Sequence, residues 1–198
     1  VLFRSDVGYD SAMQPYEYNP DKAKELLAES SYDGKELTFL ASDAFIKSED
    51  CVLAITSMLQ DVGFNVTPKI EDLATFNNEK DLGEWDLMYA SNQCINGDPY
   101  LYFTSRFVTD FMHSGFKGAD ADALRALVEQ FNVEPDAAVR DDIAKQINNW
   151  NKDFHGPALA IANIDAVYAV SNGITGVVVY PDGYESITRI DWDPSLAN

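Results

Sequence analysis

Two groups of polar and aromatic residues follow segments that the sequence predicts as neighbouring β-strands. Asp43 and Phe45 come after the apolar run 37–42, and a second group begins where the segment 85–91 ends and consists of Ser91, Asn92, Gln93, Asn96, Asp98 and Tyr100. In parallel α/β sheets, ligands bind beyond the carboxyl ends of the strands. Hydroxyl, amide and carboxyl groups exchange hydrogen bonds with polar ligands, and a ring from Tyr100 or Tyr102 supplies a flat apolar wall. We therefore expect a site for a polar solute at this edge.

Asp98 also has a purely structural interpretation. It precedes Pro99, and an Asp-Pro pair is typical of turns in which the carboxylate caps nearby backbone amides, here those of Tyr100 and Leu101. Asn92 and Gln93 are therefore the stronger candidates for direct contact with a ligand.

Groups that catalyse covalent chemistry are not apparent in the sequence. His113 and His155 are the only histidines, and there is no Gly-x-Ser-x-Gly elbow, phosphate-binding loop or His-Glu-x-x-His motif. We expect no catalytic residue, no metal site and no cofactor, so the chain is not predicted to be an enzyme. The alternative is a secreted hydrolase with a carboxylate pair in the 92–118 loop region, which requires that two acidic side chains converge across a cleft.

The two cysteines, Cys51 and Cys94, lack the spacing of zinc ligands. In the predicted strand order both lie at the carboxyl edge of the sheet, where a disulfide is geometrically feasible. Such a bond would stabilise the fold by up to about 4 kcal/mol in the chain-entropy model. Two separate, reduced cysteines are the alternative, and the sequence favours neither.

The elements that position these residues have local sequence signals. Asn19 can cap a helix that begins at Pro20, and Leu26 and Leu27 are expected to face a core. Strands and helices then alternate: a strand at 37–42, a helix at 48–62, a strand at 64–70, a helix at 73–82 and a strand at 85–91. This order predicts a parallel sheet with right-handed crossovers.

The second half of the chain has a different pattern. A loop-rich section covers 92–118, and two helices follow, one capped by Asp120 with Leu124, Leu127, Val128 and Phe131 on its apolar face, and one opened by Pro135-Asp136 with Val139, Ile143, Ile147, Trp150 and Phe154. Four β segments are predicted at 158–164, 166–170, 177–180 and 187–192. We therefore expect a helical hairpin followed by extra β-strands.

Composition limits the kinds of partner. The 198 residues are 46% hydrophobic, which suits one compact unit, and they carry a net charge of −19, which repels nucleic acids and anionic membrane surfaces. No run reaches the roughly 18 to 20 apolar residues of a membrane span.

The run Asn-Pro-Asp-Lys-Ala-Lys-Glu-Leu-Leu at 19–27 resembles the segment that opens the C-terminal lobe of ABC-importer solute-binding proteins of the peptide and nickel class. The resemblance extends over 15–193 and includes Val62-Gly63-Phe64, Trp85-Asp86-Leu87, Asp98-Pro99, the helix with Arg140, and Gly156-Pro157. It implies an α/β lobe like those of periplasmic binding proteins, with a mostly parallel sheet flanked by helices, a C-terminal helical hairpin and extra strands.

The same resemblance implies a function. It implies a monomeric binding protein that holds a peptide or other small polar solute in a cleft shared with a missing N-terminal lobe and delivers it to an ABC permease of the inner or cell membrane. The full-length parent would be periplasmic or extracellular and anchored as a lipoprotein. Val1–Ser5 look foreign, so we expect residues 1–14 to be a foreign or linker segment, 15–193 the lobe and 194–198 a tail.

One position departs from the peptide binders. They often carry an aspartate for the peptide amino group three positions before the Asp-Pro aspartate, and Ile95 occupies that position here. A free peptide amino terminus is therefore not an expected ligand unless Asp43 or Asp98 replaces the missing charge. A blocked peptide, a sugar or another polar solute are the alternatives.

Overall fold

The computed structural model describes residues 7–91, 98–108, 118–153, 158–162, 169–178 and 189–196. Contacts divide the chain into two compact units, where the length suggested one. Unit 1 comprises Val1–Met13, Gln93–Thr109 and Lys117–Asn198, and unit 2 comprises Gln14–Asn92 and Asp110–Phe116. Each unit has its own buried residues. Chain length cannot reveal such a division.

Unit 2 opens with helix α1 (Pro20–Glu29), which begins where the sequence predicts. The Asn19 side-chain oxygen accepts a 2.9 Å hydrogen bond from the Lys22 amide. The prediction that Leu26 faces a core is wrong, since its side chain is 54% exposed and no residue of α1 is buried. The helix contacts α2 (Ser48–Val62), and Leu27 reaches the end of α2 at Gly63.

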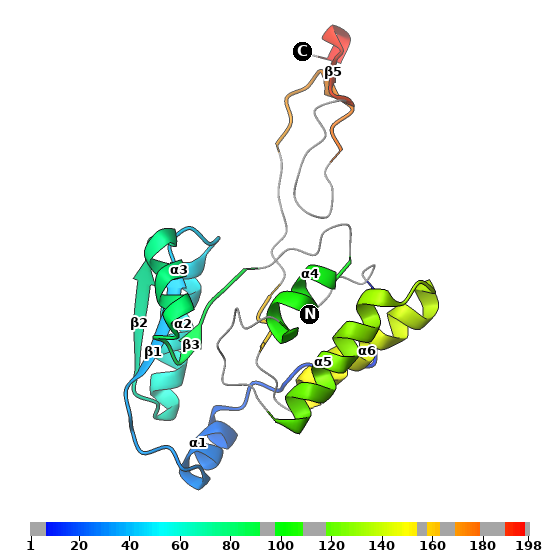
Figure 1. Cartoon of the computed structure of the whole chain (residues 1–198). Coiled ribbons are helices and arrows are strands. Elements are labelled where there is room, and N and C mark those ends of the chain that lie inside the picture. Colours follow the sequence, from blue (N-terminus) through cyan, green and yellow to red (C-terminus); the bar gives the residue numbers. More distant parts are fainter. Residues whose placement is uncertain are drawn as a thin grey trace. The chain divides into compact units, whose positions relative to one another are not determined.

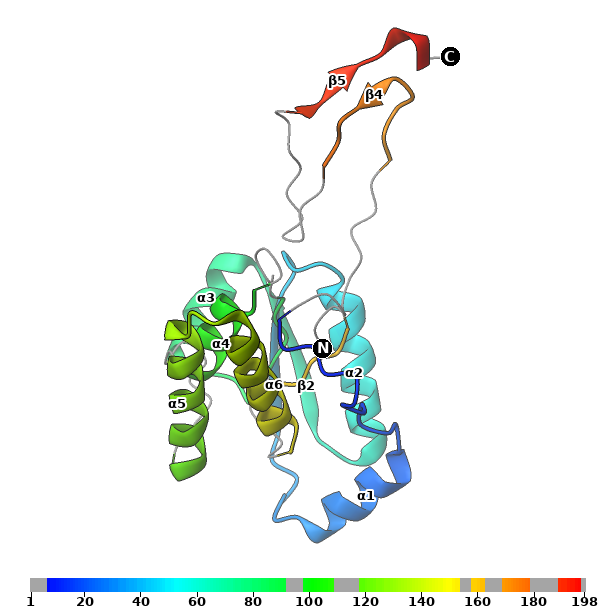
Figure 2. The same cartoon turned by 90° about the vertical axis from the view of Figure 1, so that its right-hand side faces the viewer.

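A three-stranded parallel sheet forms the centre of unit 2. It consists of β1 (Leu37–Ser42), β2 (Val66–Glu71) and β3 (Leu87–Met88) in the order β2-β1-β3. Helices α2 and α3 (Leu73–Leu82) connect the strands, and Figure 2 shows them on opposite sides of the sheet. The predicted α/β class with a parallel sheet flanked by helices is confirmed. Strand β3 is shorter than the predicted segment 85–91, and β2 begins at Val66 rather than at residue 64.

The core of unit 2 lies between the sheet and α2. Phe39 and Ala41 of β1 pack with Val52 of α2 and Val66 of β2. Because side chains alternate along a strand, Leu40 and Ser42 point to the opposite face, and both are fully buried. The central strand is therefore buried on both faces, as expected for a parallel sheet covered by helices.

Unit 1 contains the predicted helical hairpin, α5 (Ala119–Val133) and α6 (Ala137–Asp153), which lie side by side (Figure 1). It is preceded by a short helix α4 (Tyr100–Phe103) and a π-helical turn η2 (Thr104–Val108). The described apolar residues predicted for the two helices are buried or half-buried, except Val139, which is 45% exposed. Val139 lies in the first turn of α6, where its amide is capped by Asp136. The cap position of α5 is Gly118 rather than the predicted Asp120, which lies in the first turn.

Two short antiparallel strands and a final 3-10 turn end the described chain. Strand β4 (Ile174–Thr175) pairs with β5 (Asp191–Trp192), and η5 (Pro194–Leu196) follows. Extra strands are therefore present, but residues 158–162 form no strand, contrary to prediction. Those residues have no ladder partner among the described residues. The structure describes residues 169–170 of the predicted strand 166–170 and residues 177–178 of the predicted strand 177–180. None of these four residues lies in a strand.

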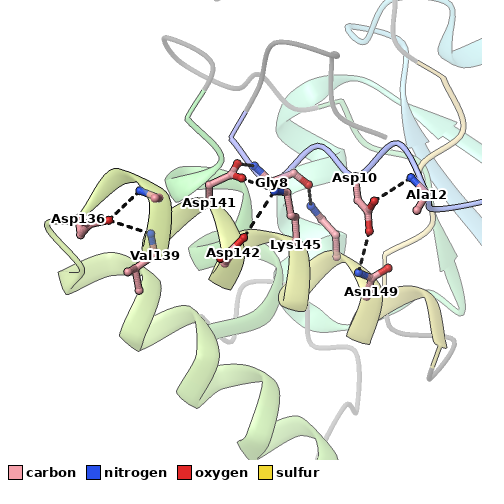
Figure 3. Close-up of polar contacts among 11 residues, drawn as sticks. Gly8, Asp10, Ala12, Asp136, Val139, Asp141, Asp142, Lys145 and Asn149 are labelled. Carbon is pink, nitrogen blue, oxygen red and sulfur yellow. Dashed lines mark hydrogen bonds and ion pairs between the residues drawn. The ribbon is translucent and has the colours of Figure 1, made fainter.

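The described part of the amino-terminal segment belongs to unit 1 and lies along α6 (Figure 3). The Gly8 amide donates to Asp141 Oδ1 at 2.7 Å, and its carbonyl accepts from Asn148 Nδ2 at 3.1 Å. Asp10 accepts from Asn149 Nδ2 at 3.3 Å. The segment 1–14 was expected to be foreign or a linker, whereas these bonds connect its residues 8 and 10 to the helical hairpin.

Candidate functional site

Predicted site residues follow the carboxyl ends of two neighbouring strands of the unit 2 sheet. Asp43 and Phe45 follow β1, and Ser91 lies three residues after β3. Since β1 and β3 are adjacent and parallel, their carboxyl ends lie at the same edge. Asp43 and Ser91 are exposed, whereas Phe45 is half-buried because its ring packs edge-on against Phe76 at 5.2 Å.

Asp43 presents its carboxylate to solvent. Its backbone amide is held by the Glu71 carbonyl at 3.0 Å, which continues the pairing of β1 with β2. Its side chain makes no hydrogen bond or ion pair with any residue that the structure describes. The backbone is therefore fixed while the charged group remains available to a ligand.

A polar contact behind this edge supports the loop that follows Asp43. The Tyr89 hydroxyl donates to the Ile46 carbonyl at 3.4 Å. Burial, together with the neighbouring Cys51 thiol, raises the pKa of Tyr89. Cys51 is half-buried and forms no disulfide with a described residue. Cys94 lies outside the described residues, so a disulfide and two reduced cysteines both stay predictions.

In unit 1, the structure accounts for both carboxylate oxygens of Asp98. The Tyr100 amide donates to Asp98 Oδ1 at 2.9 Å, which agrees with the structural interpretation of the Asp-Pro pair. The Arg140 guanidinium grips the same carboxylate with two nitrogens: Nη2 donates to Oδ1 at 3.1 Å and Nη1 donates to Oδ2. Asp98 is thus an internal partner of Arg140, and its charge is already compensated.

The electrostatic consequence is a lowered pKa. Burial of the Asp98 carboxyl disfavours its ionised form, but hydrogen bonds from Arg140 and from the Tyr100 amide outweigh this effect and hold the pKa of Asp98 below its usual value. Asp98 therefore stays ionised at neutral pH and is a poor proton donor.

The sequence interpretation missed the pairing of Asp98 with Arg140. Both residues occur in motifs that carried the family resemblance, but they lie 42 positions apart and no local pattern connects them. The presence of both motifs in one chain was the only available signal.

Tyr100 is the second predicted site residue of unit 1 in the described chain. It begins α4, and its side chain is 43% exposed, whereas Phe103 of the same helix is fully buried. Three other predicted site residues, Asn92, Gln93 and Asn96, lie outside the described residues.

Catalysis and metal binding gain no support from the described residues. No group of three or more His, Cys, Asp or Glu side chains that could hold a metal ion occurs among the described residues, which are 7–91, 98–108, 118–153, 158–162, 169–178 and 189–196. Of the carboxylates considered for a hydrolase, Asp98 is bound by Arg140 and Asp110 lies outside the described residues. Within these same ranges no helix is both long and apolar enough to span a membrane.

Residues 3–112 match the family model described as bacterial extracellular solute-binding proteins, family 5, middle. The match covers more than half of the 198 residues. It includes the sheet of unit 2, Asp43, Phe45 and the Asp98-Pro99 pair.

Solved structures show the same fold. HbpA2 from Haemophilus parasuis is 18% identical with a TM-score of 0.71, and the alignment covers 94% of this chain and 38% of that chain. The periplasmic binding protein DppA from Helicobacter pylori, in complex with peptide STSA, is 19% identical with a TM-score of 0.62 over 75% of this chain and 30% of that chain. MelB from Agrobacterium fabrum, in complex with stachyose, is 17% identical with a TM-score of 0.61 over 76% and 27%. This chain therefore spans well under half the length of the structures that it matches.

Proposed function

The chain belongs to family 5 of the bacterial extracellular solute-binding proteins, and from this premise we propose that it forms one wall of a solute-binding cleft that serves ABC import. The observation that carries the proposal is the carboxyl edge of the unit 2 sheet. There, within the part that matches the family model, the exposed Asp43 and the half-buried Phe45 follow β1, and the exposed Ser91 follows β3; the Asp43 carboxylate has no partner among the described residues. Polar groups with an aromatic wall are typical of sites for small polar ligands.

The proposed ligand is a peptide or another small polar solute. Proteins of this fold include one in complex with a peptide and one in complex with stachyose, so the fold accommodates both classes. In this chain Ile95 replaces the aspartate that peptide binders often use for the amino group, and Asp98 is compensated by Arg140. Asp43 is therefore the proposed contact for a cationic group of the solute, with Asn92, Gln93, Asn96 and Tyr100 as further proposed contacts.

The proposed setting follows from the family. An N-terminal lobe would supply the second wall, and closure about a hinge would bury the solute between the lobes. The lobe itself is proposed to span 15–193, with 194–198 as a tail. The parent protein is proposed to be a monomer in the periplasm or on the cell surface, anchored as a lipoprotein, that delivers solute to an ABC permease and performs no covalent chemistry.

Native mass spectrometry of the full-length parent, purified from its own secretion route without added ligand, tests this function. A co-purifying peptide or small solute is the expected result. The Asp43→Asn variant should lose a cationic solute, while Asp61→Asn, which changes an exposed aspartate on α2, should retain it. An empty protein that turns over hydrolase substrates would contradict the proposal and favour the carboxylate-pair alternative.

A further inference from the structure

The Arg140 side chain is fixed in both position and orientation. Its Nε donates to the Phe131 carbonyl at 3.2 Å, and its two terminal nitrogens hold the Asp98 carboxylate. Its Cζ atom lies 3.8 Å from the centroid of the Phe131 ring, so the planar guanidinium also makes a cation–π contact. Only 20% of the side chain is exposed. Few other orientations could satisfy all of these contacts together.

The surface on which Arg140 rests belongs to the core of unit 1. Phe131 of α5 is fully buried and packs edge-on against Phe103 of α4 at 5.3 Å. Phe103 in turn stacks with Phe107 at 6.1 Å. Because close-packed interiors leave little room for movement, this aromatic cluster restricts the position of the Arg140 guanidinium.

Asp98 connects the Arg140 guanidinium to Tyr100. Its Oδ1 atom accepts from both Arg140 Nη2 and the Tyr100 amide, so a single oxygen joins the guanidinium to the first residue of α4. Pro99 between them is fully buried, and its ring restricts the backbone angle φ. Helix α4 continues directly into η2, and the bond to Asp98 satisfies the first free amide of its first turn.

We propose that Arg140 is a positioning residue that acts through Asp98 to set where Tyr100 presents its ring to a solute. The inference rests on the proposed function, in which Tyr100 lines the binding site. The buried and exposed residues of α4 fit this role, because Phe103 is fully buried in the core while the residue Tyr100 is 43% exposed. Lysine in place of Arg140 would retain the charge but lose the planar guanidinium, whose two terminal nitrogens donate to both oxygens of Asp98.

The Tyr100 amide signal in a ¹⁵N–¹H NMR pH titration of this chain tests the proposal without any ligand. In the unmodified chain, the shift of this amide should follow the titration of Asp98, with a midpoint below the ordinary aspartate value. In Arg140→Lys the midpoint should rise, and hydrogen exchange of the amide should become about tenfold faster as the carboxylate loses its second anchor. In Asp98→Asn the pH dependence of this signal should disappear.

Arg125→Lys is the matched control. Arg125 also lies in the helical hairpin and donates to a backbone carbonyl, that of Phe107 at 3.2 Å, but the carboxylate that it reaches, at 3.5 Å, is that of Asp122 rather than that of Asp98. The Tyr100 titration should be unchanged in this variant. The proposal would be overturned if the Tyr100 amide of Arg140→Lys titrated with the same midpoint as in the unmodified chain. It would also be overturned if Arg125→Lys shifted that midpoint as much as Arg140→Lys does.

This test separates the two proposals. It concerns only bonds within unit 1, so a failed titration leaves solute binding untouched, whereas an empty parent protein in native mass spectrometry leaves the titration untouched. If Arg140→Lys does not fold, Asp98→Asn still tests whether the Tyr100 amide is bonded to the Asp98 carboxylate. Loss of the pH dependence of the amide signal supports that bond, and an unchanged pH dependence contradicts it.

Discussion

The backbone amide of Gly8 donates a 2.7 Å hydrogen bond to Asp141 Oδ1, although the two residues lie 133 positions apart. Gly8 has a positive φ of 84°, and a Cβ atom there would lie 2.5 Å from the Ala144 Cβ. The amino-terminal segment therefore fits into a space on α6 that only glycine can occupy, and Lys145 holds Asp141 from the other side at 2.5 Å.

Replacement of Gly8 by alanine should destabilise unit 1. Gly34→Ala is the matched control, because Gly34 has nearly the same φ, 85°, but nothing lies within 4 Å of its Cβ position. The control should cost about 1 kcal/mol from the backbone conformation alone. Gly8→Ala should cost about 1 to 3 kcal/mol more because of the clash with Ala144. Urea unfolding followed by NMR signals of each unit measures both, and equal costs would show that the segment is not seated on α6.

Unit 1 should lose stability in acid. The Gly8 amide, followed by Lys145, lowers the pKa of Asp141, and Arg140 lowers the pKa of Asp98 against the effect of burial. An aspartate whose pKa is lowered by folding stabilises the fold fully above its unfolded pKa, near 3.8, and loses that contribution as the pH falls through the lower folded value. Stability should therefore be level at neutral pH and fall below about pH 4.

Asp141→Asn tests this acid dependence. The variant should be less stable than the unmodified chain at neutral pH, and the difference should shrink as the pH falls below 3.8, since the native carboxylate then loses its charge too. Asp153→Asn, at the exposed end of the same helix, is the control and should change neither quantity. Urea midpoints measured from pH 7 to pH 2.5 provide the comparison, and a difference that stays constant over that range would refute the assignment.

The aromatic core of unit 1 should depend on Phe131. Phe131→Ala removes a fully buried ring that contacts Phe103 and supports the Arg140 guanidinium. The expected cost is about 3 to 5 kcal/mol. Val133→Ala, two residues later on the same helix at a side chain that is 78% exposed, should change stability by less than about 0.5 kcal/mol. Chemical denaturation measures both, and similar small effects would mean that Phe131 is not the centre of this core.

Charge at Asp43 should select among solutes of the parent protein. The peptide Ser-Thr-Ser-Ala and its amino-acetylated form serve as probes, because acetylation removes the cationic amino group. If Asp43 meets that group, the free peptide should bind more tightly, by a factor of about ten, which corresponds to one charge-assisted hydrogen bond. Asp43→Asn should abolish the difference and Asp61→Asn should preserve it. Equal affinities for the two peptides in the unmodified protein would argue against a cationic contact at Asp43.

The positions of the main helices were predictable because their signals are local. Asn19 and Pro20 mark the start of α1, and α2 and α3 have the predicted bounds 48–62 and 73–82. Caps and periodic patterns act within a few residues of the backbone, so they can be interpreted without knowledge of the rest of the fold. The same holds for Asp98, whose bond to the Tyr100 amide spans only two positions.

The sequence by itself determined the α/β class, the order of strands and helices in unit 2 and the place of Asp43 at the carboxyl edge, because these follow from local patterns and from the handedness of crossovers. The tertiary structure alone decided that Arg140, among 14 lysines and arginines facing 33 acidic residues, is the partner of Asp98. It also decided that Leu26 is exposed and that Gly8 lies against Ala144. Burial and ion pairing depend on which distant segments meet, and composition and spacing do not encode that choice in a form that can be inferred from one sequence.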